Sequence, residues 1–175
     1  MRYRFAAAAL LLSTHAAVPA SLELAVKAAY LDKFLAFVEW PQSSFPAADS
    51  PIDICIVGRN PFGRLVDHIV AGQRVGGRPI VVRYLSEVSA RSACHLAYLG
   101  RPAAQSISQE IEILRYRPVL TVTDWSAGPT DKGIINLVVD NNRVRFEVDE
   151  RAAEQSHIGI SSKLLDLELH RQTDN

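Results

Sequence analysis

The sequence has little of what marks a nucleic-acid-binding or membrane-spanning protein. Its 175 residues carry 19 basic and 19 acidic side chains, so no excess of positive charge is available for nucleic acid or anionic lipid. Beyond the N-terminal residues, no apolar run is long enough to cross a bilayer. The length is sufficient for one domain with a real core. We therefore expect a globular domain without a nucleic-acid partner.

Metal-binding and phosphate-binding motifs are also missing. His68, His95 and His157 stand far apart, without the close spacing of metal ligands. Residues 58–63 lie between an expected strand and an expected helix, where α/β proteins often bind phosphate. They lack both the Gly-Lys-Ser/Thr ending of a P-loop and a GxGxxG pattern, so their glycines are better explained as turn formers. The sequence predicts neither a metal nor a cofactor.

No catalytic constellation is visible. Asp124 ends an expected strand, at the edge where open α/β sheets gather their active sites. Ser161, Ser162 and Lys163 resemble a Ser/Lys pair only superficially, because Ser161 is better explained as the N-cap of the last helix. A Gly-x-Ser-x-Gly elbow is absent. These features predict a protein that is not an enzyme.

Residues 1–20 have the features of a secretory signal peptide. Two arginines precede an apolar run at residues 5–12, and small residues lead up to Ala20. The alternative, an uncleaved anchor, is disfavoured because this run is too short to span a bilayer. Cleavage after Ala20 would leave residues 21–175 as one domain with 17 basic and 19 acidic residues, a net charge of −2.

The two cysteines, Cys55 and Cys94, are expected to form a structural disulfide if the chain is exported to an oxidising compartment. A redox-catalytic role is the weaker alternative, since no Cys-x-x-Cys motif is present. In the chain-entropy model, closing a loop of about 40 residues stabilises a fold by roughly 4 kcal/mol.

Residues 24–41 (LAVKAAYLDKFLAFVEWP) show the apolar spacing of a helix that ends at Pro41. Its charged residues fall on several sides of the helix instead of one wet face. Two interpretations follow. The helix is buried on more than one side, against its own domain and a second protein, or it is a plain core helix whose lysines reach water.

The rest of the chain alternates short apolar strands with helices, which favours an α/β fold with a largely parallel sheet covered on both faces. We expect strands at residues 52–57, 79–84, 94–99 and 118–123, and helical segments at residues 62–71, 86–92, 103–114, 150–156 and 161–169. Asn60 is the expected N-cap of the first of these helices. A flavodoxin-like strand order, 2-1-3-4, would bring Cys55 near Cys94.

Residues 133–139 and 143–148 are expected to form a β-hairpin near the C-terminus. On its second strand Arg145 and Glu147 alternate with apolar residues and should lie on the wet face. Trp40 and Phe62 are also expected to be exposed. Because aromatic residues and arginine are enriched in protein interfaces, these positions are candidates for contact with a partner.

Taken together, the segments resemble the YfiR family of exported proteins (the DUF4154 domain). The matching pieces run in order over nearly all of the chain after residue 20: VKAAYLDKFLAFVEWP, ICIVGRNPFG, GRPIVVR, CHLAYL, VLTVTD and VRFEVDERAAEQSHIGISSKLLDLEL. The resemblance implies a Rossmann-like periplasmic protein, commonly dimeric. It also implies repression of a membrane-bound diguanylate cyclase through the periplasmic sensing domain of that enzyme, and hence control of cyclic-di-GMP and biofilm formation.

On this hypothesis we expect partner contacts at Trp40, Arg145, Glu147 and Lys163. The Cys55–Cys94 pair matches the strand-linking disulfide of the family. Some relatives carry a second cysteine pair near the hairpin that is linked to redox control, but no cysteine follows Cys94 here. The family often shows paired glycines before the fifth strand, where this chain has Lys132-Gly133.

Two alternatives stay open. The protein could be a small-ligand sensor that acts on another membrane receptor, such as a histidine kinase or a transporter, with its site in a cleft near Gly58 and Asp124. It could also be an exported hydrolase, which would require a nucleophile and a base within hydrogen-bond reach.

Overall fold

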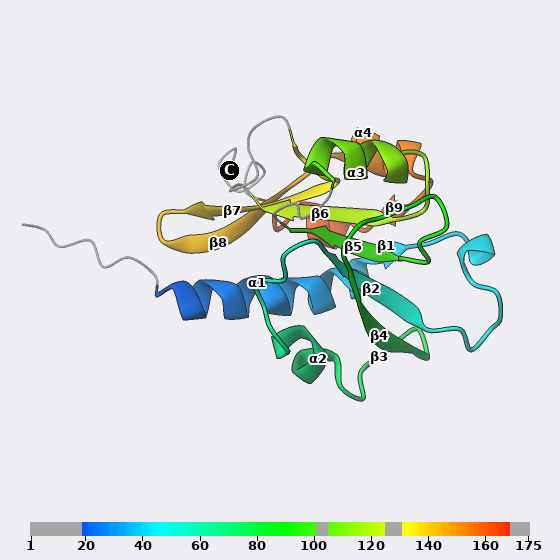
Figure 1. The fold of residues 1–175 in the computed structure, drawn as a ribbon, viewed down its shortest axis with the longest axis horizontal. Coiled ribbons are helices and arrows are strands. Elements are labelled where there is room, and N and C mark those ends of the chain that lie inside the picture. Colours follow the sequence, from blue (N-terminus) through cyan, green and yellow to red (C-terminus); the bar gives the residue numbers. More distant parts are fainter. Residues whose placement is uncertain (1–18, 101–104, 125–130, 169–175) are drawn as a thin grey trace, which may run out of the picture.

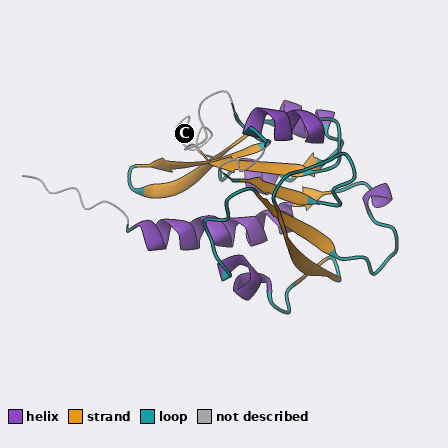
Figure 2. Cartoon of the chain, viewed as in Figure 1, coloured by secondary structure: helices purple, strands orange, loops and turns teal. Residues whose placement is uncertain are grey.

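A seven-stranded mixed sheet forms the centre of the fold, with helices packed against it (Figures 1 and 2). The computed structural model describes residues 19–100, 105–124 and 131–168. The helices are α1 (Ala20–Phe34), α2 (Leu65–Val70), α3 (Ile107–Leu114), α4 (Glu150–Gln155) and α5 (Ser162–Leu165), with 3₁₀ turns at Leu35–Phe37 and Gln42–Ser44. The strands are β1 (Val38–Glu39), β2 (Ile52–Val57), β3 (Arg74–Val75), β4 (Arg78–Leu85), β5 (Leu96–Leu99), β6 (Leu120–Asp124), β7 (Ile135–Asp140), β8 (Arg143–Val148) and β9 (Gly159–Ile160).

The strand order in the sheet is β3-β4-β2-β5-β6-β7-β8. Neighbouring strands from β4 to β7 run parallel, whereas β3 and β8 pair antiparallel with β4 and β7. The predicted order 2-1-3-4 corresponds to β4-β2-β5-β6 and is confirmed. The sheet is therefore largely parallel, as expected, but mixed at both ends.

Two hydrophobic clusters lie on opposite faces of the sheet. Ile54 and Ile56 of β2 belong to the cluster that contains α1, whereas Cys55 and Val57 belong to the cluster that contains α3. Alternate residues of a strand point to opposite faces, so all six residues of β2 are buried. This two-sided burial explains why the central strands are continuous apolar runs.

The N-terminal helix is a core helix of its own domain. Phe34 has no exposed surface, and its ring stacks on Tyr30 at 5.5 Å and meets Phe146 of β8 edge-on at 5.3 Å. The burial of α1 against its own domain is therefore confirmed, while its contact with a second protein stays a prediction in which Phe34 has no exposed surface to offer. The predicted helical end at Pro41 is wrong, because α1 ends at Phe34 and the chain continues through a 3₁₀ turn into β1.

The predicted helix start at Asn60 and the predicted helical turn at residues 86–92 are also wrong, because polar side chains form hydrogen bonds with nearby backbone groups there. Asn60 does not cap α2; its Oδ1 accepts the Phe62 N–H at 2.8 Å and its Nδ2 donates to the Gly63 carbonyl at 2.8 Å. This local turn delays the helix to Leu65. In residues 86–92, which form bends and turns, the Ser92 hydroxyl accepts the Ser89 N–H at 3.0 Å.

The prediction that Phe62 is exposed is wrong as well. Only 6% of its surface is accessible, and its ring packs edge-on against Tyr98 at 4.8 Å. Ser161 is the N-cap of α5, as predicted, and its hydroxyl accepts the Lys163 N–H at 3.3 Å.

A small second sheet joins the two ends of the described chain. Strand β1 pairs antiparallel with β9, with Val38 opposite Ile160 and Glu39 opposite Gly159. Two residues per strand are too few to produce a recognisable sequence pattern, so this pairing could not be predicted.

The strands β7 and β8 pair antiparallel through a tight turn. Asn141 and Asn142 in this turn both have positive φ, at 46° and 59°, as a two-residue hairpin connection requires. Val144 and Phe146 of β8 are buried and Arg143 is exposed. The strand β8 is not the last element, because α4, β9 and α5 follow it.

Candidate functional site

The predicted disulfide between Cys55 and Cys94 is present in the structure. Cys55 of β2 and Cys94, two residues before β5, are bonded, with their Cα atoms 5.7 Å apart. The pairing of β2 with β5 brings them together, since Ile54 lies opposite Leu96. Both cysteines are buried, so the bond ties two neighbouring central strands from inside the core.

Trp40 is half-buried, not fully exposed as predicted. Its indole N–H donates to the His95 carbonyl at 3.0 Å, and its ring meets the His95 ring edge-on at 6.0 Å. Phe45 stacks on the same imidazole at 4.5 Å. Trp40 therefore anchors the segment after β1 to the beginning of β5, and only part of its surface is available to a partner.

Arg145 and Glu147 share one face of β8, as predicted, and both are partly exposed. The Glu147 carboxylate forms an ion pair with Lys132 Nζ at 2.7 Å. Lys163 is exposed in α5. Trp40 follows β1, and Lys163 follows β9. Because β1 and β9 are antiparallel, the two residues lie beyond opposite ends of this strand pair. The four predicted contact residues thus come from β8, α5 and the segment after β1, and their binding role stays a prediction.

A pocket of about 310 Å³ opens at the carboxyl ends of β2, β5 and β6. This is the edge of the sheet where β4 and β5 diverge on either side of β2, and such switch points are the usual ligand sites of open α/β sheets. Charged residues and apolar residues line it together: Glu23, Leu24, Lys27, Arg59, Pro61, Tyr98, Leu99, Gly100, Ile107 and Asp124.

A buried ion-pair cluster forms the charged wall of this pocket. Lys27 of α1 is 4% exposed, and its Nζ lies 2.5 Å from Glu23 Oε1 and 2.6 Å from Asp124 Oδ2. Burial by itself lowers the pKa of Lys27, but the hydrogen bonds and charges of Asp124 and Glu23 outweigh it and raise the pKa. The pocket therefore favours the charged form of Lys27 more strongly than water does.

Tyr98 lies beside this cluster, whose negative charges affect the pKa of its phenol. Burial, followed by the negative charges of Asp124 and Glu23, raises the pKa of its phenol. The sequence supplied two signals for this arrangement, the four-residue spacing of Glu23 and Lys27 and the position of Asp124 at a strand end. The ion pair between Lys27 and Asp124, which are 97 residues apart in the sequence, was not predicted.

His95 lies at the opposite, amino-terminal edge of the sheet. Its Nδ1 accepts the Asp53 N–H at 3.0 Å, and the Asp53 carboxylate binds Arg83 at 2.6 Å. Burial lowers the pKa of His95, with the nearby Asp53 acting in the opposite direction. The imidazole is thus a neutral, hydrogen-bonded core group, in agreement with its interruption of an apolar strand.

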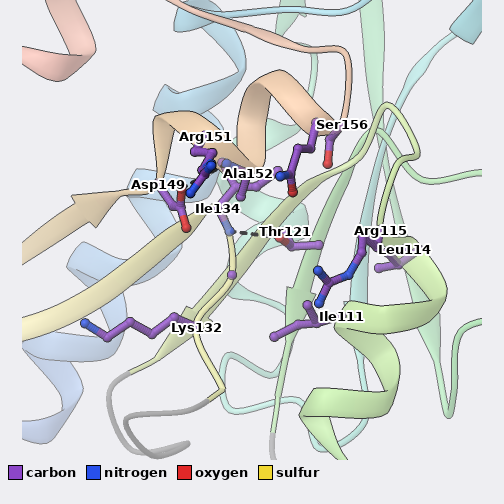
Figure 3. Close-up of a pocket in the computed structure, with 12 residues that line it drawn as sticks. Ile111, Leu114, Arg115, Thr121, Lys132, Ile134, Asp149, Arg151, Ala152 and Ser156 are labelled. Atoms are coloured by element: carbon purple, nitrogen blue, oxygen red, sulfur yellow. Dashed lines mark hydrogen bonds between the residues drawn. The ribbon is translucent and has the colours of Figure 1, made fainter.

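A smaller pocket of about 180 Å³ lies between α3, α4 and the entrance to β7 (Figure 3). Thr121 Oγ1 accepts the Ile134 N–H at 2.9 Å on its floor, and Arg115 and Arg151 stand on opposite sides (Figure 3). Gly133 permits the close approach of the two strands, because a Cβ there would lie 2.7 Å from the Thr121 carbonyl oxygen. This pocket gathers none of the four predicted contact residues.

Two further observations bear on the class of protein. Within residues 19–100, 105–124 and 131–168, no three His, Cys, Asp or Glu side chains are grouped so that they could hold a metal ion. In the same residues, no helix has the length and apolar character needed to span a membrane.

The family model described as DUF4154, YfiR/HmsC-like, matches residues 24–168, which is most of the chain. The chain belongs to the YfiR/HmsC-like family. YfiR-family proteins are periplasmic regulators of diguanylate cyclases, and they are not enzymes. No curated protein matches this chain.

Proposed function

We propose that this YfiR-like protein is exported to the periplasm, where it binds and represses the sensing domain of an inner-membrane diguanylate cyclase. Cyclic-di-GMP, and with it biofilm formation, would then depend on conditions outside the cytoplasm. The observation that carries the proposal is the family match over residues 24–168. Removal of residues 1–20 as a signal peptide and the Cys55–Cys94 disulfide both fit an oxidising compartment.

Repression would work through a difference in affinity. A bound repressor shifts the cyclase toward its inactive conformation only to the extent that it binds this conformation more tightly than the active one. Deletion of the gene should therefore raise cyclic-di-GMP in a strain that carries the neighbouring cyclase gene. An unchanged concentration in that strain would count against the proposal.

We place the cyclase contact on the Arg145 and Glu147 face of β8, extended by Trp40 and Lys163. Arg145→Ala and Lys163→Ala should each weaken binding to the isolated sensing domain, measured by calorimetry. Glu154→Ala, an exposed change on α4, serves as the control. Trp40 should be changed to Phe instead of Ala, because loss of the ring would also disturb its packing against His95. Equal affinity of the variants and the control would remove this surface from the proposal.

The family resemblance also leads us to propose a homodimer. The helix α1, for which contact with a second protein is one interpretation of the sequence, buries Phe34 in the protein's own core. A charge introduced at Phe34 would unfold the domain, so the dimer interface has to be sought elsewhere on the molecule.

A second candidate function is the sensing of a small ligand for a different membrane receptor. The pocket of about 310 Å³ beside Lys27 and Asp124 favours it, because this pocket lies at the switch point of the sheet and combines charged and apolar walls. Native mass spectrometry of protein purified from the periplasm would reveal a retained small molecule. A signal lost in Asp124→Asn and kept in Glu154→Ala would support this function.

A further inference from the structure

The cleft of about 180 Å³ between α3 and α4 has a local excess of positive charge. Arg115 of α3, Lys132 before β7 and Arg151 of α4 are its basic lining residues, and Asp149 is the single acidic one among the described residues of its wall. The Asp149 carboxylate is already engaged as the N-cap of α4, where it accepts the Ala152 N–H at 2.9 Å. Because the whole chain carries equal numbers of basic and acidic residues, this excess is a property of the cleft and not of the composition.

The three basic side chains are engaged to different degrees. Lys132 Nζ binds Glu147 at 2.7 Å, and its side chain extends away from the two arginines (Figure 3). Arg115 Nε lies 2.8 Å from a carboxylate oxygen of Glu112, but this acid is 69% exposed, and a guanidinium has further N–H donors for another acceptor. Arg151 is exposed and forms no ion pair within residues 19–100, 105–124 and 131–168. The two arginines therefore hold donors that the protein itself does not fully use.

Two nearly buried hydroxyls in the same wall add further donors. Ser156 is 6% exposed, and its hydroxyl has no hydrogen-bond partner among the residues that the structure describes. Thr121 is 5% exposed, and its Oγ1 accepts the Ile134 N–H at 2.9 Å, which leaves the proton of this hydroxyl without an acceptor in the described chain. Buried polar groups usually have partners, so both hydroxyls indicate an acceptor that comes from outside the protein. Water can accept these bonds, but it cannot also neutralise the arginines.

The positions of the donors restrict the shape of the ligand. Thr121 and Ile134 lie between Arg115 and Arg151 in Figure 3, so donors surround the cleft on two sides and on its floor. A carboxylate presents its oxygens in one plane, whereas a tetrahedral oxyanion presents oxygens in several directions. A volume of about 180 Å³ equals about six water molecules at about 30 Å³ each, which is enough for a phosphate ion and too small for a nucleotide.

We propose that this cleft binds one tetrahedral oxyanion, either inorganic phosphate or the phosphate group of a small phosphomonoester. Arg115 and Arg151 neutralise its charge from opposite sides, and the hydroxyls of Thr121 and Ser156 donate to the oxygens that point to the floor. The inference is independent of the proposed repression of a cyclase, because it concerns an ion bound by the isolated protein.

Calorimetric titration of the purified protein with inorganic phosphate tests the proposal. At constant ionic strength in chloride buffer, we expect saturable binding of one anion per chain. Arg151→Gln should weaken this binding about tenfold, because it removes a charge-assisted contact. Arg143→Gln changes an exposed arginine of β8 outside the cleft and should keep the wild-type affinity.

Ser156→Ala separates binding from stability. Its hydroxyl has no partner to lose within the described chain, so the unfolding midpoint without phosphate should stay unchanged while phosphate binding weakens severalfold. A lower midpoint with unchanged phosphate affinity would show that the hydroxyl has a structural role and would count against its place in the site.

Glycerol 3-phosphate and succinate distinguish the forms of the ligand. Binding of glycerol 3-phosphate as tight as that of phosphate, or tighter, would assign the site to a phosphomonoester, whereas binding of phosphate alone would assign it to the free ion. Both outcomes support a tetrahedral oxyanion. Succinate that binds more tightly than either phosphate compound would contradict the tetrahedral geometry.

Amide chemical shifts locate the ion without a variant. The Ile134 N–H donates to Thr121 on the floor of the cleft, so phosphate should shift the Ile134 amide resonance with the dissociation constant that calorimetry gives. Three results would overturn the proposal: no saturable binding, equal affinity of wild type and Arg151→Gln, or shifts confined to residues outside the cleft. An unchanged cyclic-di-GMP concentration after gene deletion would instead contradict the proposed repression and leave this site intact.

Discussion

Glu110 is the buried charge whose environment predicts the clearest pH effect. It lies in α3 with no exposed surface, and neither carboxylate oxygen has a hydrogen-bond partner among the described residues. Burial raises the pKa of Glu110 from 4.5 to about 7. The folded protein therefore favours the neutral, protonated form of the Glu110 carboxyl group.

The sign of the effect follows from proton linkage. Because the folded-state pKa is above the unfolded-state value, the folded protein binds more protons between pH 4.5 and about 7, and its stability falls as the pH rises through this range. Full ionisation in the folded core costs about 3 kcal/mol relative to acid conditions. Glu110→Gln keeps the shape of the side chain and cannot ionise.

Denaturant unfolding of wild type and Glu110→Gln at several pH values measures this cost. Between pH 5 and pH 8 the free energy of unfolding of the variant should gain about 2.5 kcal/mol relative to wild type, since all other groups titrate alike in the two proteins. Glu112→Gln is the matched control, because Glu112 lies on the same helix with its side chain 69% exposed. A difference between Glu110→Gln and wild type that does not vary with pH would refute the reasoning.

Three further stability changes follow from contacts in the core, each measured by denaturant unfolding. Gly100→Ala should cost about 1–3 kcal/mol, because its Cβ would lie 2.4 Å from a backbone oxygen; an unchanged midpoint would contradict this. Lys27→Met should cost about 1–3 kcal/mol by removing the cation that the partly buried carboxylates of Asp124 and Glu23 share, and adding Asp124→Leu should recover part of the loss; strictly additive losses would argue against the coupling. Reduction of the Cys55–Cys94 bond should lower the free energy of unfolding by about 4 kcal/mol, and equal stability of oxidised and reduced protein would be the contrary result.

Local sequence patterns were sufficient for the central sheet. The run Ile52–Val57 is apolar at every position because β2 is covered on both faces, and such runs can be recognised without knowing the partners. The same holds for the Asn141-Asn142 turn, since these residues tolerate positive φ. These features depend on neighbours only a few residues away.

The failures concern features that depend on distant residues or on competing hydrogen bonds. Asn60 could cap a helix or close a turn, and its sequence neighbours do not decide between the two. Phe62 was predicted to be exposed because it lies in a loop, but the loop folds inward onto Tyr98. The ion pair between Lys27 and Asp124 forms only when the sheet has brought α1 and the end of β6 together, so composition and spacing could not predict it.

Contacts between early and late elements of the described chain affect the order in which the fold can form. Phe34 of α1 packs on Phe146, and β1 needs β9 as its only partner in the described residues. An N-terminal helix that waits for strands more than 100 residues later cannot bury its aromatic face while the chain is still being made. The packing of α1 and β1 is therefore completed only after strands from the C-terminal part of the described chain have been made.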